Sequence, residues 1–128
     1  WRGHDLRGLI AACRDHGVAV MNIRVLAAGV LATEQRHGRE VPMSDAAPLA
    51  LEEERARAVF ARLGERYGTR AQTAIRFALA NPEIACVLVG MAELAHLEEA
   101  LAAAEMGPLP EEALRELGEV HARGFDGP

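Results

Sequence analysis

The chain has 128 residues, half of them hydrophobic, which is typical of a single globular domain and excludes an intrinsically disordered chain. Its formal net charge of -5 at pH 7 speaks against a nucleic-acid-binding surface, which needs clustered positive charge. All 14 basic residues are Arg, so chemistry that depends on a lysine amine is excluded.

The first predicted helix and strand lie within the first 25 residues. Asp5 is expected to cap an amphipathic helix, and Gly17 is expected to end it in a left-handed conformation. Residues 18–25 then alternate with a period of two, which predicts a strand with one fully apolar face. The other face ends in Asn22 and Arg24. Parallel α/β folds bind ligands at the carboxyl ends of strands, so we expect both side chains to project there.

A long connection and a charged helix come next. Residues 27–50 have no periodicity and contain several Gly and Pro residues, which predicts a long loop with at most a short helical turn. Residues 51–67 predict an amphipathic helix. The side chains on its inward face are Ala56, Val59, Phe60, Leu63 and Tyr67.

The segment 69–104 carries the clearest pattern in the chain. Thr69 and Gln72 form a capping box at the start of a helix. Residues 84–89 are an almost uninterrupted apolar run, which predicts a strand covered on both faces, and Gly90 follows it. Further helices are expected at residues 94–104 and after Pro110.

Two strands cannot make a self-sufficient sheet, because their free edges need partners. We therefore predict an α/β fold with two parallel strands and about five helices, as a single partial domain over residues 1–128. The sheet is expected to be part of a barrel or a doubly wound sheet, or to be completed by another chain.

Metal binding and disulfide formation are not predicted. The five histidines never pair at ligand spacing. Cys13 and Cys86 lie in apolar settings without a CxxC spacing, which favours a reduced, cytoplasmic protein. No apolar stretch is long enough to predict a membrane span.

Two stretches together, residues 16–31 (HGVAVMNIRVLAAGVL) and 69–117, resemble the carboxyl-terminal part of an aldo-keto reductase, and the resemblance covers essentially the whole chain. Members of that family are (β/α)8 TIM barrels that reduce carbonyl groups with NADPH. The resemblance implies that residues 18–24 form the seventh barrel strand and residues 86–89 the eighth, so that this chain is the cofactor side of the barrel.

The resemblance also implies which residues bind the cofactor. The family's S-P-L-x-x-G falls on Arg24, Val25, Leu26 and Gly29, where only Leu26 and Gly29 match. Its I-P-G ends on Gly90, where only that glycine matches. The implied cofactor-binding residues are Arg24, Leu26, Gly29, Gly90, Met91, His96 and Glu99.

The family's positions beside the 2′-phosphate depart most from its pattern. The basic residue expected there falls on Ala92 or Glu93, and an acidic Glu93 would repel a phosphate but could accept from a free ribose hydroxyl. The cofactor is therefore NADP or NAD. Arg24 could instead form a salt bridge at the barrel rim, Gly90 could simply permit a tight turn, and His96 could be an ordinary surface residue.

The family's catalytic Asp, Tyr, Lys and His come from the first four strands, so no catalytic residue is expected in this chain. Lys is absent, and Tyr67 lies on an apolar helix face. Two functions remain open. The chain could be the cofactor-binding portion of a reductase of aldehydes or ketones, inactive without its amino-terminal half, or a non-catalytic half-barrel that serves as a structural or interaction module.

Overall fold

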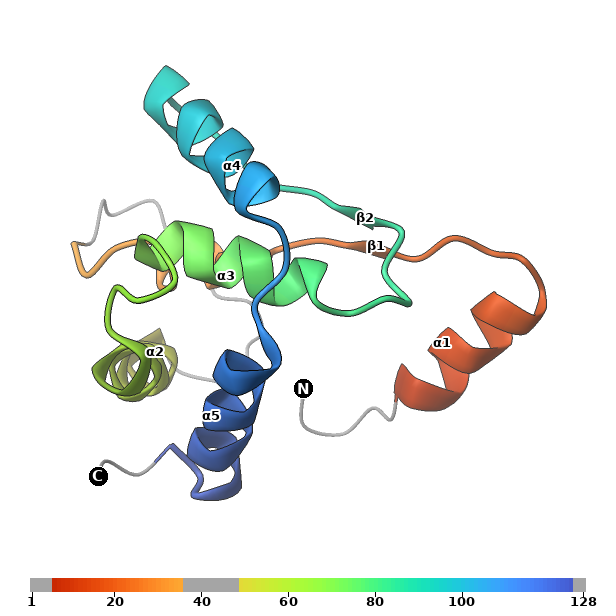
Figure 1. Ribbon diagram of the computed structural model, residues 1–128, viewed down its shortest axis with the longest axis horizontal. Coiled ribbons are helices and arrows are strands. Elements are labelled where there is room, and N and C mark those ends of the chain that lie inside the picture. Colours follow the sequence, from red (N-terminus) through yellow and green to blue (C-terminus); the bar gives the residue numbers. More distant parts are fainter. Residues whose placement is uncertain (1–5, 36–48, 126–128) are drawn as a thin grey trace.

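A computed structural model describes residues 6–35 and 49–125 of the chain (Figure 1). Its elements are, in order, α1 (Leu6–Asp15), β1 (Met21–Asn22), the 3-10 turn η1 (Ala27–Gly29), α2 (Leu49–Leu63), α3 (Arg70–Leu79), β2 (Cys86–Val87), α4 (Leu94–Met106) and α5 (Glu111–Ala122). Within these residues, five α-helices and two strands confirm the predicted fold class.

The two strands pair in parallel, with Met21 opposite Cys86 and Asn22 opposite Val87. Both strands are much shorter than the predicted 18–25 and 84–89, and the prediction that the second is covered on both faces is wrong. Met21 is 64% exposed and Cys86 is exposed as well. The reason is physical: each strand pairs with only one other strand among the described residues, and α3 adds only a small contact with β2, so little extends or covers the ladder.

Two local signals at helix ends, the capping box at Thr69 and the glycine stop at Gly17, are confirmed. Thr69 and Gln72 form the expected capping box, in which the Thr69 hydroxyl accepts from the Gln72 N–H at 3.2 Å. Gly17 adopts the expected left-handed conformation, with φ of 68°. The helix predicted at residues 51–67 instead spans Leu49–Leu63, because Gly64 turns left-handed directly after it. Asp5 lies outside the described residues.

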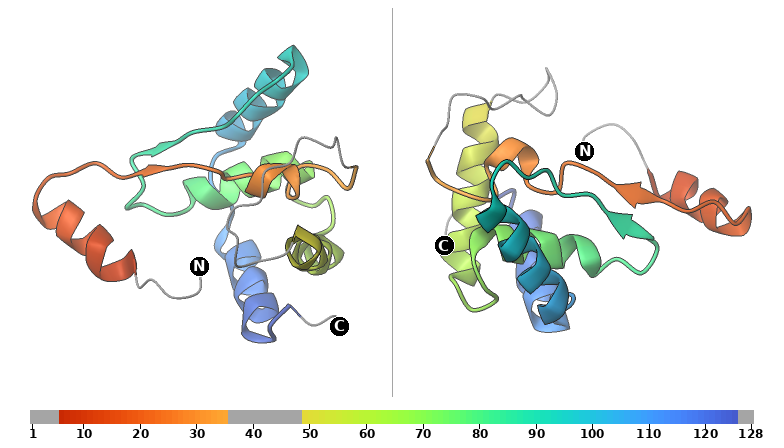
Figure 2. Two further views of the ribbon diagram at one scale, coloured as in Figure 1. Left: turned by 180° about the vertical axis from the view of Figure 1, so that it is seen from behind. Right: turned by 90° about the horizontal axis from the view of Figure 1, so that it is seen from above.

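The hydrophobic core belongs to the helices that follow the long connection. α3 packs against α4, and α2 packs against α5, so that α3 runs through the middle of the molecule (Figures 1 and 2). Most of the buried apolar side chains are Ala, and Leu63 is the only large one that is fully buried among the described residues. The buried apolar residues of these four helices and their turns are Ala56, Leu63, Ala71, Ala74, Ile75, Ala78, Ala103, Leu109 and Ala113.

A buried arginine on α3 holds the turns around this core. The Arg76 guanidinium donates to the carbonyl oxygens of Tyr67 at 2.7 Å, Gly107 at 2.8 Å and Pro108 at 3.2 Å. The first carbonyl lies before α3 and the other two lie between α4 and α5. One side chain therefore satisfies backbone acceptors from two separate turns.

A second polar cluster joins α2 to α5. The Glu116 carboxylate lies 3.0 Å from Arg62 Nε and 2.8 Å from Arg66 Nη2. The hydrogen bond from Arg66 holds the pKa of the Glu116 carboxyl below its ordinary value, and the same bond raises the pKa of Arg66. This cluster fixes the position of α5 beneath α3 (Figure 1).

Candidate functional site

The parallel pairing of β1 and β2 determines where the predicted site begins. The hydrogen bond from the Leu88 N–H to the Asn22 carbonyl, at 2.9 Å, is the last one between the two strand segments before both leave the sheet. Because the strands are parallel, residues after Asn22 and residues after Val87 emerge at the same edge (Figure 2). All seven predicted cofactor residues come after that hydrogen bond.

The prediction that Arg24 lies on a strand face is wrong, because β1 already ends at Asn22. It is exposed and adopts a left-handed conformation with φ of 58°, and its carbonyl accepts from the Ala27 N–H at 2.9 Å. Arg24 therefore opens a tight turn at the carboxyl end of β1. That placement still carries a positive charge to the sheet edge where parallel folds bind anions.

Leu26 and Gly29 shape the next turn. The Leu26 carbonyl accepts from the Gly29 N–H at 2.9 Å and from the Leu31 N–H at 3.2 Å. Gly29 is left-handed, with φ of 94°, a conformation that favours glycine. Leu26 and Gly29, the two residues that match the family pattern, thus lie in one hydrogen-bonded turn around η1. Val30, which follows this turn, is buried and anchors it to the rest of the molecule.

Gly90 has a different environment. A Cβ added there would meet no heavy atom within 4 Å, and its φ is not left-handed. Neither the backbone nor any packed neighbour among the described residues therefore requires a glycine at this position. The space at Gly90 leaves room for a group that approaches the backbone closely.

Met91 and His96 belong to the start of α4. Met91 is exposed, and the Ala92 N–H, which precedes the N-cap residue, donates to His96 Nδ1 at 3.3 Å. The N-cap residue, Glu93, makes no side-chain capping hydrogen bond. Backbone donors at this helix end consequently remain open to a ligand, as they do wherever a helix N-terminus is left uncapped.

Glu99 is held by another helix. Its half-buried carboxylate accepts a hydrogen bond from the Thr69 hydroxyl at the N-cap of α3. The structure does not gather all seven residues at one point, since the chain after β2 runs on to an α4 that begins away from η1 (Figures 1 and 2). The predicted residues instead form two segments, 24–29 and 90–99, which share one sheet edge.

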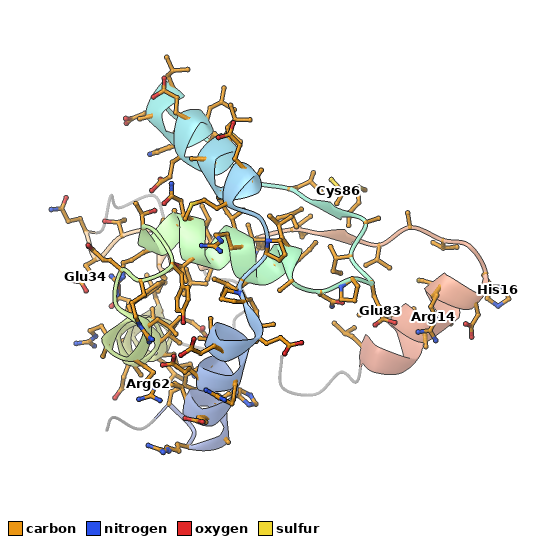
Figure 3. All side chains as sticks on the ribbon, in the orientation of Figure 1. Arg14, His16, Glu34, Arg62, Glu83 and Cys86 are labelled. Atoms are coloured by element: carbon orange, nitrogen blue, oxygen red, sulfur yellow. The ribbon has the colours of Figure 1, made fainter. Side chains whose placement is uncertain are left out.

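Sequence reasoning missed the contacts that link these segments to α3. The Arg70 Nη1 atom lies 3.0 Å from the Glu34 Oε1 atom, and its guanidinium carbon lies 4.4 Å from the centre of the Phe60 ring. Glu34 and Arg70 are separated by a long connection, so no local pattern could reveal the pair. Figure 3 shows Glu34 at the end of the molecule opposite Arg14 and Glu83.

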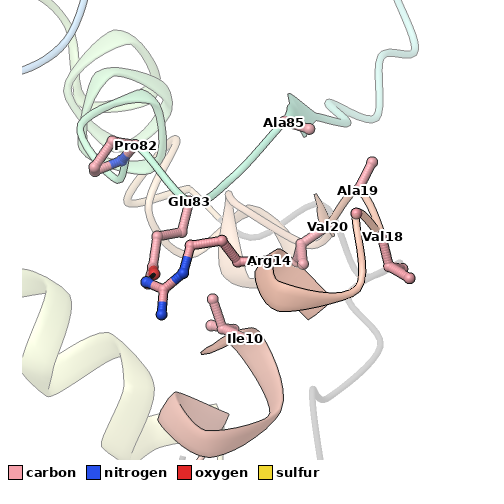
Figure 4. A pocket seen from close by; sticks show the side chains of 9 residues that line it. Ile10, Arg14, Val18, Ala19, Val20, Pro82, Glu83 and Ala85 are labelled. Atoms are coloured by element: carbon pink, nitrogen blue, oxygen red, sulfur yellow. Dashed lines mark hydrogen bonds and ion pairs between the residues drawn. The ribbon is translucent and has the colours of Figure 1, made fainter. Parts of the chain in front are cut away.

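Two grooves lie at that opposite end, between α1 and the amino ends of the strands. The larger, of about 320 Å³, is bordered by the ion pair between Arg14 and Glu83, whose atoms are 2.8 Å apart (Figure 4). The smaller, of about 210 Å³, is apolar and lies between α1 and β1. None of the seven predicted residues lines either groove, and in parallel barrels this end serves stability rather than chemistry.

Two further properties concern the described part of the chain only. Residues 6–35 and 49–125 contain no group of three or more His, Cys, Asp or Glu side chains arranged to hold a metal ion. None of the helices within these ranges is both long and apolar enough to cross a membrane.

Comparison with known proteins supplies the remaining evidence. The model of the Aldo/keto reductase family matches residues 1–122, which is nearly the whole chain. The comparison with curated proteins found no match.

Proposed function

The chain belongs to the aldo/keto reductase family, and we propose that it forms the cofactor-binding side of an NAD(P)H-dependent reductase of aldehydes or ketones. In this proposal β1 and β2 are the last two strands of the family's (β/α)8 barrel. The observation that carries it is the parallel pairing of Asn22 with Val87, because it directs both predicted cofactor segments to one sheet edge.

The residues at that edge fit a dinucleotide. Arg24 brings a positive charge, and the turn at Leu26 and Gly29 offers a compact, hydrogen-bonded backbone. The uncapped start of α4 adds the positive end of a helix dipole, which attracts phosphate oxygens. In this assignment Arg24 and Gly29 hold the pyrophosphate, while Met91, His96 and Glu99 line the adenosine side.

Glu93 leads us to propose NADH as the preferred cofactor. It is exposed and lies at the N-cap of α4, where the family's cation beside the 2′-phosphate would fall. A carboxylate there accepts from the free ribose hydroxyl of NADH but repels the 2′-phosphate of NADPH. Two unit charges 4 Å apart in water repel by about 1 kcal/mol, which corresponds to about fivefold in affinity.

The rest of the reaction site must come from outside the two strands described here. A bound nicotinamide supplies the hydride for carbonyl reduction, while this chain binds and orients the other end of the cofactor. The unpaired lateral sides of β1 and β2 support a barrel completed by further strands, which come from an amino-terminal half or from another chain. We place the protein in the cytoplasm, as a working expectation for a reductase that draws on a soluble cofactor pool.

The test is a titration of the intact gene product with NADH and with NADPH, followed by nucleotide fluorescence. We expect saturable binding, with NADH about fivefold tighter, and the Glu93→Gln variant should reverse or abolish that preference. Glu98→Gln, on an exposed position of the same helix, is the matched control and should change neither affinity. Absence of any fluorescence change at millimolar nucleotide would refute the proposal.

The second candidate is a non-catalytic structural or interaction module. The exposed apolar residues of α4 favour it: Leu94 is 70% exposed, and Leu97 and Leu101 lie one and two turns further along the same stripe. A contiguous exposed apolar stripe on a helix marks a surface that a partner can cover. Sedimentation that finds a folded, nucleotide-free oligomer would favour this module over the reductase.

A further inference from the structure

The first turn of α3 contacts segment 90–99 of the proposed cofactor site and the chain that directly follows segment 24–29. At its N-cap, the Thr69 hydroxyl donates to the carboxylate of Glu99 on α4. The next residue, Arg70, forms an ion pair of 3.0 Å with Glu34, which ends the longer segment 24–34 that contains the predicted residues 24–29. Two adjacent residues therefore connect the two halves of the site through α3.

Arg70 is the fixed member of its pair. Its side chain is only 19% exposed, while that of Glu34 is 73% exposed. The Arg70 guanidinium lies 4.4 Å from the centre of the Phe60 ring, so α2 holds it by a cation–π contact. Arg70 is therefore the partner held by the helical core, and Glu34 is the exposed partner that reaches it from the surface.

The segment that Glu34 closes is strained. Arg24, Ala27 and Ala28 all have φ between 48° and 58°, a region that residues with a Cβ rarely occupy. Such conformations persist only where the surroundings hold them, and they are common at ligand clamps. Here the hydrogen bonds of the turn hold the start of the segment, buried Val30 holds its middle, and the ion pair with Arg70 holds its end.

From these contacts we infer that the first turn of α3 is a positioning clasp for the dinucleotide site. Arg70 holds the strained segment 24–34 through Glu34, and Thr69 holds α4 through Glu99. The inference rests on the proposed function, since the two segments form a binding site only if a dinucleotide lies along that sheet edge. Arg70 and Thr69 are positioning residues, and neither needs to touch the cofactor.

Hydrogen exchange of the intact gene product without cofactor tests the clasp itself. The Glu34→Gln variant removes the ion pair and should speed exchange of the amides of residues 27–33 by about two- to fivefold, the range for an exposed pair. The difference should shrink but persist at 1 M salt, because a contact pair with one partly buried partner is screened less than an exposed pair. The control is Glu83→Gln, which removes the same charge from the pair with Arg14 and should leave these amides unchanged.

Two further variants separate the pair from a general charge effect. If Glu34 acts through Arg70, exchange in the Glu34→Gln/Arg70→Gln double variant is no faster than in Arg70→Gln. The swap Glu34→Arg with Arg70→Glu should restore part of the protection, because it recreates the pair in reverse. Unchanged exchange in Glu34→Gln, or additive effects in the double variant, would overturn the clasp.

The α4 side has its own test. Thr69→Asp keeps a good N-cap for α3 but replaces the hydroxyl donor with a carboxylate that repels Glu99. We expect faster exchange at the start of α4 with α3 unchanged, whereas Thr69→Ser should behave as the parent protein. Equal exchange in Thr69→Asp and Thr69→Ser would overturn this half of the clasp.

The cofactor readout is the dissociation rate of NADH, measured by stopped-flow displacement. Glu34→Gln should raise this rate by about the same two- to fivefold factor as the amide exchange. Faster exchange with an unchanged dissociation rate would overturn the positioning role. A parent protein that binds neither NADH nor NADPH would instead overturn the proposed function, while the exchange experiment would still decide whether the clasp exists.

Discussion

The helical part, α2 to α5, and the arm made of α1, β1 and β2 differ in how much of their apolar surface they bury. Nine of the ten buried apolar residues in the described chain lie between Ala56 and Ala113, and Val30 is the tenth. In the arm, Leu9, Met21 and Ile23 are 59%, 64% and 62% exposed. Both parts have apolar sequences, so composition does not explain the difference.

The difference lies in the number of neighbours that each part finds. α3 packs along α4 and α2 packs along α5, whereas β1 packs mainly against β2, and β2 adds a small contact with α3 (Figure 1). Apolar side chains are stabilised by the area that they remove from water, so the arm gains little free energy in the described chain. Within the described residues, the arm is therefore the part that its own packing stabilises least.

Removal of the Arg76 guanidinium should give the largest loss in the helical part. Arg76→Met removes the side chain that donates to all three carbonyl oxygens, and loss of a buried hydrogen-bonding partner costs about 1–3 kcal/mol. We expect the free energy of unfolding to fall by about 1–3 kcal/mol, measured by urea denaturation. Arg57→Met, on an exposed face of α2, should cost less than about 0.5 kcal/mol. A similar small cost for both would contradict the role given to Arg76.

One enlarged side chain in each part sharpens the comparison. Ala103 is fully buried between α4 and α3, so Ala103→Leu should lower the free energy of unfolding by about 1–3 kcal/mol through overpacking. Ala85, at the start of β2, is exposed, and Ala85→Leu should change it by less than about 0.5 kcal/mol. Thermal denaturation of the two variants checks this. An arm packed as tightly as the core would show equal losses.

The smallest expected effect concerns pH and is confined to the contact between α2 and α5. The pKa of Glu116 is lowered in the folded state by the hydrogen bond from Arg66, so its contribution is present above the unfolded pKa. That contribution disappears as the pH falls through the lowered pKa. Glu116→Gln should therefore flatten the acid side of the stability curve, whereas Glu111→Gln, on an exposed position of α5, should leave its slope unchanged. Parallel curves for Glu116→Gln and the parent would show that the pair is not formed.

Much of the fold could be predicted from local patterns. A capping box such as Thr69 with Gln72, or a left-handed glycine such as Gly17, acts within a single turn, and the same atoms satisfy each other in any tertiary context. The apolar run at residues 84–89 likewise determined that a strand follows α3. The family was predicted separately, from the resemblance of residues 16–31 and 69–117 to aldo-keto reductases, and the match of the family model to residues 1–122 confirms it.

Strand length and the contacts of the site depended on tertiary structure. A strand extends only as far as its neighbours pair with it, so residues 18–25 could not reveal that β1 would span only Met21–Asn22. Arg76 and Arg70 look like ordinary helix residues in the sequence, and the resemblance that singled out Glu99 did not reveal its partner. Their partners lie on other elements, at Gly107, Glu34 and Thr69. Only the packing of helices brings such distant groups within hydrogen-bonding distance, because hydrogen bonds and ion pairs form at about 3 Å whatever the separation along the chain.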